Sequence, residues 1–275
     1  MNRFALVVSD VDGTLVTGEK VLTRRAIEAV HRLGEAGIGF SICSSRPPFG
    51  LSMVTRPLAL GLPFGAFNGA AIAAPDLDLL SANRLSRQAA RRAVELLEDE
   101  GVEVWLFTAR AWFLRNPLGD RVAHEIRTIA TGPTEVHSFE EHLDDASKIV
   151  GASSDLEKVA RCEELGRAAL GALATVARSQ PYYVDFTPPG THKGLLIAFL
   201  SQRLGISPQQ IAVLGDMEND LEMFKRAGFS IAMGNAAPEV KAAAGATTLS
   251  NEEDGFALAI EREILGMDRH GGGHT

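Results

Sequence analysis

The sequence predicts an α/β fold with a doubly wound parallel sheet, into which a region of α+β character is inserted. Predicted strands and helices alternate near the start of the chain, and the same alternation returns from about Pro188. Between these parts lie short predicted strands joined by tight turns, in a region that holds both tryptophans and both tyrosines. We therefore expect a parallel-sheet core of residues 1–82 and 188–267, and an inserted α+β domain of residues 83–187.

The first predicted strand leads directly into a loop with two carboxylates. Residues 4–8 are all apolar, and Asp10 and Asp12 follow them. Two acids this close repel each other unless a cation lies between them, and Mg2+ is the natural candidate. Gly13 allows close approach of the backbone, and Thr14 supplies donors for an oxyanion. By itself such a motif is more often a solvated turn or a weak calcium loop, so its meaning depends on its partners.

A helix and a second strand follow the first loop. Thr23 is the predicted cap of a helix that ends before Gly37, and residues 38–43 form the next predicted strand. A strand-helix-strand unit makes the two strands parallel and places their carboxyl ends at one edge of the sheet. We therefore expect Asp10 and Ser44 to be neighbours.

The second and third predicted strands also end in polar residues. Ser44 and Ser45 offer hydroxyl and backbone N–H groups that bind a phosphoryl oxygen, although an ordinary Ser-rich turn is the alternative. Arg46 completes this loop, and for it we favour a structural ion pair over a catalytic role. The strand of residues 65–67 ends at Asn68, a further candidate for substrate contact, although an Asn-Gly turn needs no such role.

The middle region predicts its own small sheet with helices. Ser86 is the predicted cap of an amphipathic helix, and residues 102–107 and 111–114 predict two strands joined by a tight turn. The further predicted elements are residues 148–152, 156–168, 172–177 and 182–186. Trp112, Arg115 and Tyr183 are candidates for facing a substrate, and an error of one residue in register turns each of them to the opposite side. Their selection as candidates therefore depends on the register of these strands.

Acids and a lysine return in the last part of the chain. Lys193 opens an apolar helix, where a cation is unfavourable beside the positive helix end, so nearby anions explain it better than a surface role. The strand of residues 211–214 leads into Asp216, Asn219 and Asp220. A further strand closes at Asn235 on the same expected edge of the sheet.

Composition narrows the class of protein. With 275 residues and 45% apolar content the chain can bury a large core, and a net charge of −8 disfavours nucleic acid and anionic membranes as partners. Cys43 and Cys162 suggest neither a disulfide framework nor a zinc cluster. No apolar run suits a signal peptide or a membrane span, so we expect a soluble, cytoplasmic protein. Residues 268–275 predict a disordered tail, which makes His270 and His274 weak metal candidates.

Taken together, the polar loops resemble those of the haloacid dehalogenase (HAD) superfamily of phosphohydrolases, and in particular its Cof-like branch. The match uses residues 10–15, the Ser44 loop, Lys193 and residues 215–220, in that order and at suitable spacing. The resemblance covers nearly the whole chain. It implies a HAD-like (Rossmannoid) core with an inserted, mobile α+β cap of the C2 type that selects the substrate.

The resemblance implies a role for each motif residue. Asp10 is the implied nucleophile, which forms an aspartyl phosphate, and Asp12 the implied general acid and base. Ser44 is expected to hydrogen-bond the transferring phosphoryl group, and Lys193 to neutralise charge on it and on Asp10. One departure is visible at Ser45, where the family usually has glycine.

The resemblance also implies a cofactor and candidate contacts. Mg2+ is expected to be held by Asp10, the backbone carbonyl of Asp12 and Asp216, with Asn219 and Asp220 in or near its coordination shell. The candidate substrate contacts are Gly13, Thr14, Ser45, Arg46, Asn68 and Asn219.

We therefore expect a Mg2+-dependent phosphatase that hydrolyses a small phosphorylated metabolite, with a sugar phosphate as the first choice. The nearest alternative is a phosphomutase of the phosphomannomutase type, which returns the phosphate to sugar instead of water. A non-catalytic protein that binds phosphorylated metabolites is the alternative from another class. The sequence speaks against it because Asp10, Asp12, Lys193 and Asp216 are all present.

Overall fold

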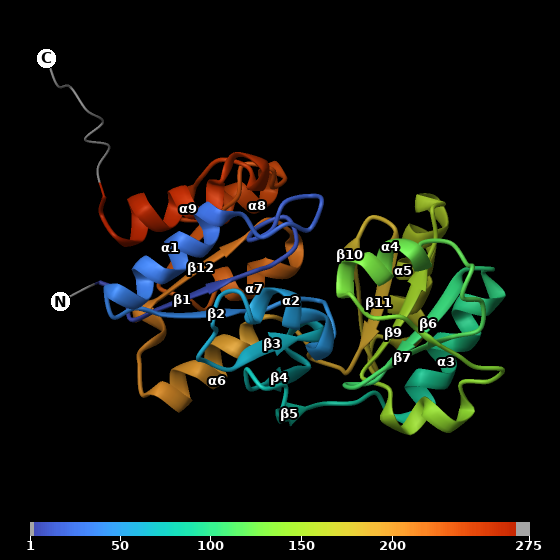
Figure 1. Cartoon of the computed structure of the whole chain (residues 1–275). Helices are drawn as coiled ribbons and strands as arrows, with labels where there is room; N and C mark the ends of the chain where they lie inside the picture. The colour runs from blue at the N-terminus through green and yellow to red at the C-terminus, as the bar shows by residue number, and fades with distance from the viewer. Residues whose placement is uncertain (1–2, 268–275) are drawn as a thin grey trace, which may run out of the picture. The chain divides into compact units, whose positions relative to one another are not determined.

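The computed structural model describes residues 3–267, which form two compact units (Figure 1). Unit 1 consists of Met1–Cys43, Pro57–Leu62 and Ile197–Thr275, and unit 2 consists of Ser44–Arg56 and Pro63–Leu196. The domain boundaries expected from the sequence stay a prediction. The expected tail of residues 268–275, with His270 and His274, lies outside the described residues.

Unit 1 is built on a five-stranded parallel sheet with the strand order β14-β13-β12-β1-β2. Its strands are β1 (Leu6–Ser9), β2 (Gly39–Ile42), β12 (Ile211–Gly215), β13 (Phe229–Ala232) and β14 (Ala246–Thr247). Its helices are α1 (Arg24–Glu35), α7 (Leu221–Phe224), α8 (Pro238–Ala242) and α9 (Gly255–Ala259), and α6 (Gly194–Leu204) enters it from unit 2. Short 3₁₀ segments are η4 (Pro208–Gln210), η5 (Glu218–Asp220) and η6 (Asn251–Glu253), and η7 (Ile260–Ile264) is a π-helix.

The sequence of unit 1 explains this arrangement. β1 is buried along its whole length, as a parallel strand covered on both faces must be. The Thr23 hydroxyl caps α1 by accepting a hydrogen bond from the backbone N–H of Ala26, which confirms the predicted cap. Ser9 pairs with Ile42 of β2 and with Leu214 of β12. The carboxyl ends of these strands therefore lie at one edge.

Unit 2 contains two further sheets. A three-stranded antiparallel sheet has the order β3-β4-β5, and a six-stranded mixed sheet has the order β10-β11-β9-β6-β7-β8. The strands are β3 (Phe64–Ala66), β4 (Ala71–Ala73), β5 (Leu79–Ala82), β6 (Glu103–Phe107), β7 (Trp112–Leu114), β8 (Thr134–Glu135), β9 (Lys148–Ala152), β10 (Thr175–Gln180) and β11 (Tyr183–Thr187). The helices are α2 (Ser52–Thr55), α3 (Arg87–Asp99), α4 (Val122–Ile129) and α5 (Leu156–Leu170), with 3₁₀ segments η1 (Pro48–Leu51), η2 (Phe67–Gly69) and η3 (Glu140–Asp145).

The six-stranded sheet has two different faces. The helix face carries aliphatic residues such as Leu106 and Val184, which share one buried cluster with residues of α3 and α5. The opposite side, which we call the aromatic face, carries Trp105 against Trp112 and Tyr183, with ring centroids 5.4 and 5.2 Å apart. Side chains alternate between the faces along each strand, as the pleat requires.

Several predicted boundaries in unit 2 are wrong by a few residues. The strand expected at residues 65–67 is Phe64–Ala66, because the chain turns into η2 at Phe67. The strand expected at residues 172–177 begins only at Thr175, because α5 continues to Leu170 and is followed by a turn. Helix α4 was not predicted. It begins at a left-handed residue without a side-chain cap, so it lacks the usual start signal.

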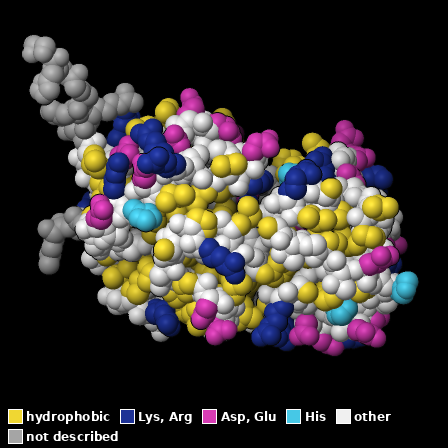
Figure 2. Space-filling view, viewed as in Figure 1, with side chains coloured by type: hydrophobic (Ala, Val, Ile, Leu, Met, Phe, Trp, Pro, Cys, Tyr) yellow, Lys and Arg dark blue, Asp and Glu magenta, His cyan; other side chains and the backbone are white. Residues whose placement is uncertain are grey.

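Charged side chains of both signs lie interspersed on the face drawn in Figure 2, with apolar side chains between them. Many of the surface charges are paired, for example Arg32 with Glu261 in unit 1 and Arg91 with Glu140 in unit 2. Within residues 3–267, no helix is both long enough and apolar enough to cross a membrane.

Candidate active site

Three carboxylates of unit 1 gather at the carboxyl edge of the parallel sheet. Asp10 follows β1, and its backbone N–H donates to the carbonyl oxygen of Leu214 at 3.0 Å. Asp216 follows β12, and Asp220 ends η5. One carboxylate oxygen from each of Asp10, Asp216 and Asp220 lies within 4.8 Å of the others. Carboxylates this close repel one another, so this donor set fits a hard divalent cation such as Mg2+.

The Asp220 carboxylate is oriented by its own loop. It is fully buried, and its Oδ2 accepts hydrogen bonds from the backbone N–H groups of Asp216 at 2.9 Å and Met217 at 3.0 Å. Gly215 leaves the necessary room, because a Cβ there would lie 2.5 Å from the Cβ of Asp220. The glycine and the acid are therefore linked by steric fit, which explains their spacing in the sequence.

The first loop orients Asp216 from the other side. The Thr14 hydroxyl donates to Asp216 Oδ1 at 3.0 Å. Gly13 has a φ of +83°, and a Cβ there would lie 2.3 Å from Asp216 Oδ2. Asn235 donates through Nδ2 to the Gly13 carbonyl oxygen at 2.9 Å and to Asp216 Oδ2 at 3.3 Å. Gly13 and Thr14 were predicted as substrate contacts. In the structure Gly13 leaves room for the Asp216 carboxylate, and Thr14 donates a hydrogen bond to it.

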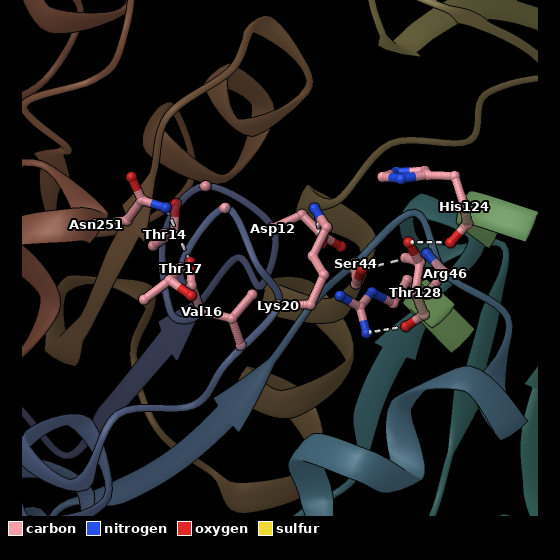
Figure 3. A network of polar contacts seen from close by, with 12 residues as sticks. Asp12, Thr14, Val16, Thr17, Lys20, Ser44, Arg46, His124, Thr128 and Asn251 are labelled. Atoms are coloured by element: carbon pink, nitrogen blue, oxygen red, sulfur yellow. Dashed lines mark hydrogen bonds and ion pairs between the residues drawn. The ribbon is translucent and has the colours of Figure 1, made fainter. Parts of the chain in front are cut away.

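Asp12 forms an ion pair that the sequence did not predict. Its Oδ1 lies 2.8 Å from Lys20 Nζ, and both side chains are largely buried (Figure 3). Lys20 is held in a turn, where its backbone N–H donates to the Thr17 carbonyl oxygen at 2.9 Å. A single lysine in a turn belongs to no recognisable motif, so only the fold reveals this partner.

Asn251 is a second residue that the sequence analysis missed. Its Nδ2 donates to the Val16 carbonyl oxygen at 2.9 Å, and its backbone N–H donates to Asn235 Oδ1 at 3.1 Å. Figure 3 shows Asn251 beside Thr14 and Val16. Two asparagines therefore join the loops after β1, β13 and β14, and of these only Asn235 gave a signal, because it follows a predicted strand.

The predicted serine loop belongs to unit 2. Ser44 is buried, its backbone N–H donates to the Gly65 carbonyl oxygen at 3.0 Å, and its own carbonyl accepts from Asn68 N–H at 2.8 Å. Its hydroxyl oxygen accepts a hydrogen bond from the backbone N–H of Arg46 at 3.2 Å. Ser45, in the place usually taken by glycine, has no positive φ, so its side chain brings no left-handed strain.

Arg46 and Lys193 are both buried in unit 2. Arg46 donates through Nη1 to the carbonyl oxygen of Thr128 in α4 at 2.7 Å (Figure 3). Lys193 is only 1% exposed and immediately precedes α6. The preceding residue, His192, lies close to Gly69. A Cβ added to Gly69 would be 2.7 Å from the His192 carbonyl oxygen. The Lys193 segment and the Asn68 turn are thus in contact.

The three candidates for a substrate-facing role on the inserted strands have structural partners. The indole N–H of Trp112 donates to the Thr131 carbonyl oxygen at 3.2 Å. Arg115 pairs with Glu98 at 2.7 Å. Tyr183 donates to Glu125 Oε2 at 3.1 Å, and burial raises the pKa of its phenol above the usual range. Trp112 and Tyr183 are buried, so packing explains them.

Comparison with known proteins adds the family. The protein-family model described as haloacid dehalogenase-like hydrolase matches residues 7–260. The chain belongs to this family. The resemblance to the Cof-like branch and the predicted fold class are thereby confirmed, and this haloacid dehalogenase-like hydrolase is a phosphoric monoester hydrolase.

Several relatives match this hydrolase over most of their length. A 5-amino-6-(5-phospho-D-ribitylamino)uracil phosphatase of Bacillus subtilis is 26% identical over 287 residues, covering 95% of this chain and 98% of the relative. An HMP-PP phosphatase of Cronobacter sakazakii is 29% identical over 238 residues, covering 85% of each. The crystal structure of a haloacid dehalogenase-like hydrolase from Bacteroides thetaiotaomicron has a TM-score of 0.85 at 29% identity, covering 94% of this chain and 99% of that one.

Proposed function

We propose that this hydrolase is a Mg2+-dependent phosphatase that acts on a small phosphorylated metabolite through an aspartyl phosphate. The observation that carries the proposal is the group of Asp10, Asp216 and Asp220, whose oxygens lie within 4.8 Å of one another at the carboxyl edge of the parallel sheet. Membership of the haloacid dehalogenase-like hydrolase family supports a role for this acidic group in hydrolysis.

The proposed reaction has two steps. An Asp10 carboxylate oxygen attacks phosphorus, the bond from phosphorus to the leaving oxygen breaks, and Asp12 protonates that oxygen. Asp12 then takes a proton from water, the water oxygen attacks phosphorus, and cleavage of the acyl phosphate regenerates Asp10 with release of phosphate. The ion pair with Lys20 fixes the direction of the Asp12 carboxylate.

The acids that follow β12 are the proposed cation ligands together with Asp10 and the Asp12 carbonyl, and Asn219 lies in the same loop. Bound Mg2+ would lower the repulsion between the anionic nucleophile and the anionic substrate. The bonds from Thr14 and Asn235 to Asp216, and those from backbone N–H groups to Asp220, hold these carboxylates in place.

Ser44 and Lys193 are the proposed phosphoryl-binding residues of unit 2. Lys193 brings a positive charge to a buried position, where it would attract the negative charge of a phosphoryl group. Asn68, Ser45 and Arg46 shape the Ser44 loop, and their contacts support a role in positioning that loop.

The proposed substrate is a phosphate ester of a sugar or sugar alcohol. In this proposal the inserted domain selects the substrate, and the enzyme acts in the cytoplasm. Support comes from the relative of Bacillus subtilis, whose name describes a phosphorylated ribityl compound. The substrates of that enzyme and of the HMP-PP phosphatase are both small phosphorylated molecules.

The test measures phosphate release from a panel of sugar, sugar-alcohol and heterocyclic phosphates, with Mg2+ or with EDTA. We expect release that needs Mg2+ and is abolished by Asp10→Asn, which is nearly isosteric and removes the nucleophile. Asp99→Asn, at an exposed helix end, is the matched control and should retain full activity. Activity that survives in Asp10→Asn contradicts the mechanism. Release that depends on a bisphosphate activator indicates a mutase instead.

A further inference from the structure

Two charged residues interrupt the aromatic face of the six-stranded sheet. Lys148, the first residue of β9, is 5% exposed, and Asp185 of β11 is 2% exposed. Lys148 pairs with Phe107 of β6 across the sheet, and Asp185 pairs with Val150. The two charges thus lie on the same face as the tryptophans, away from solvent.

The ammonium group of Lys148 connects four separate segments of unit 2. Its Nζ lies 3.2 Å from Asp185 Oδ2 and donates to the Ser45 carbonyl oxygen at 3.1 Å. It also lies over the rings of Phe107 and Phe67, at 5.4 and 6.0 Å from their centroids. Among the described residues, the second carboxylate oxygen of Asp185 is buried without a hydrogen-bond partner.

Stability alone does not account for such a pair. Removing two charges from water costs free energy that their attraction often fails to repay, so apolar residues of similar size are frequently as stable or more stable. The unpartnered oxygen of Asp185 adds to this cost. The contact that apolar residues cannot replace is the hydrogen bond from Lys148 to Ser45.

That hydrogen bond reaches Ser44 through a single peptide group. The carbonyl of Ser45 and the N–H of Arg46 belong to one planar unit, so fixing one end fixes the direction of the other. Lys148 holds the carbonyl end at 3.1 Å, and the N–H end donates to Ser44 Oγ at 3.2 Å. Because the hydroxyl oxygen accepts this bond, the hydroxyl hydrogen remains to donate elsewhere.

We propose that Lys148, paired with Asp185, is a positioning residue that sets the Ser44 hydroxyl to donate to the phosphoryl group. The role of Asp185 is to keep the ammonium group directed at Ser45. This inference rests on the proposed function, since it assumes that Ser44 binds the phosphoryl group of the substrate. It makes the six-stranded sheet a part of the phosphoryl-binding apparatus as well as a scaffold.

The test is a double-mutant cycle with Lys148→Met, Ser44→Ala and the double variant, using p-nitrophenyl phosphate or the best substrate of the panel. Lys148→Met should lower kcat/KM by about tenfold or more when Ser44 is present, and by less than about twofold in the Ser44→Ala background. Lys148→Arg should recover part of the activity, because it keeps a charged donor. Effects that multiply independently overturn the proposal, because Lys148 then does not act through Ser44.

A matched control separates positioning from loss of stability. Val184→Ala removes volume from the helix face of the same sheet and should destabilise the protein while leaving kcat/KM within about twofold.

If the wild-type protein releases no phosphate, the proposed function fails, and exchange of the Arg46 amide hydrogen still tests the inference. Lys148→Met should speed that exchange by about tenfold or more relative to Val184→Ala, and an unchanged rate overturns it.

Discussion

The acids of unit 1 and the buried Lys148–Asp185 pair of unit 2 are placed in opposite ways. In unit 1, Asp10 and Asp216 follow the ends of parallel strands, where loops supply backbone and hydroxyl donors. In unit 2, Lys148 and Asp185 lie in strands, and the ammonium group of Lys148 lies over aromatic rings. The first arrangement gathers like charges that a cation can bind, and the second holds one pair that directs a single hydrogen bond.

The difference shows what each sheet contributes. A parallel sheet collects the carboxyl ends of its strands at one edge, so its topology brings distant acids together. A mixed sheet has no such common edge, and a charge on one of its faces meets the residues that the register and the segments packed on that face place there. The acids of unit 1 are therefore close enough to share a cation, whereas the pair of unit 2 acts on a loop.

The largest expected effect tests the acids of unit 1. Asp12→Ala should lower kcat by about 100-fold to 10,000-fold, because both proton transfers lose their acid and base. Rapid-quench measurements should show slower formation and slower breakdown of the phosphoenzyme. Lys20→Met keeps the carboxylate and loses only its partner, so it should cost less; an equal loss in both variants would place the essential group on Lys20 instead.

The next effect concerns the fit between the first loop and Asp216. Gly13→Ala combines a φ of +83° with a clash against Asp216 Oδ2, so kcat/KM should fall by about tenfold or more. Gly37→Ala is the matched control, because Gly37 has a φ of +72° and open space around its missing Cβ. It should lose about 1 kcal/mol of stability and no activity. Equal activity in the two variants would show that the contact with Asp216 is unimportant.

A smaller effect in stability is expected for the pair of unit 2. Replacing both charges, as Lys148→Met with Asp185→Leu, should leave the free energy of unfolding unchanged or raise it by about 1 kcal/mol or more. Urea denaturation measures this, with Asp185→Leu alone as the control, which leaves a buried charge and should be clearly less stable. Strong destabilisation of the double variant would make the pair a structural element rather than a positioning one.

The smallest effect is expected at Glu222, a partly exposed carboxylate with two basic partners. Hydrogen bonds from Lys225 and Arg226 lower the pKa of Glu222 to about 2, and its side chain is 33% exposed. The resulting stabilisation is fully present above about pH 4.5 and is lost as the pH falls toward about 2, because pairing needs the ionised carboxylate. Glu222→Gln should cost less than about 1 kcal/mol at neutral pH. The difference from wild type should shrink in urea denaturation at about pH 3.

Much of the candidate site followed from local patterns. Asp10, Asp216 and Asp220 were predicted as acids at strand ends, and the structure brings their oxygens within 4.8 Å of one another. Lys20 and Asn251 were not predicted, because a single polar residue in a turn carries no periodic or spacing signal. Their contacts depend on which loops meet.

The sequence by itself determined the parallel sheet of unit 1 and the acids at its edge, because strand-helix alternation and connection handedness leave few topologies. The resemblance of its polar loops to known motifs indicated the family. Only the tertiary structure decided which partner each side chain meets. Lys148 shows the reason: its neighbours Phe67, Phe107 and Asp185 come from distant parts of the chain. In a strand, a shift of one residue turns a side chain to the other face, and only packing of the whole unit fixes that register.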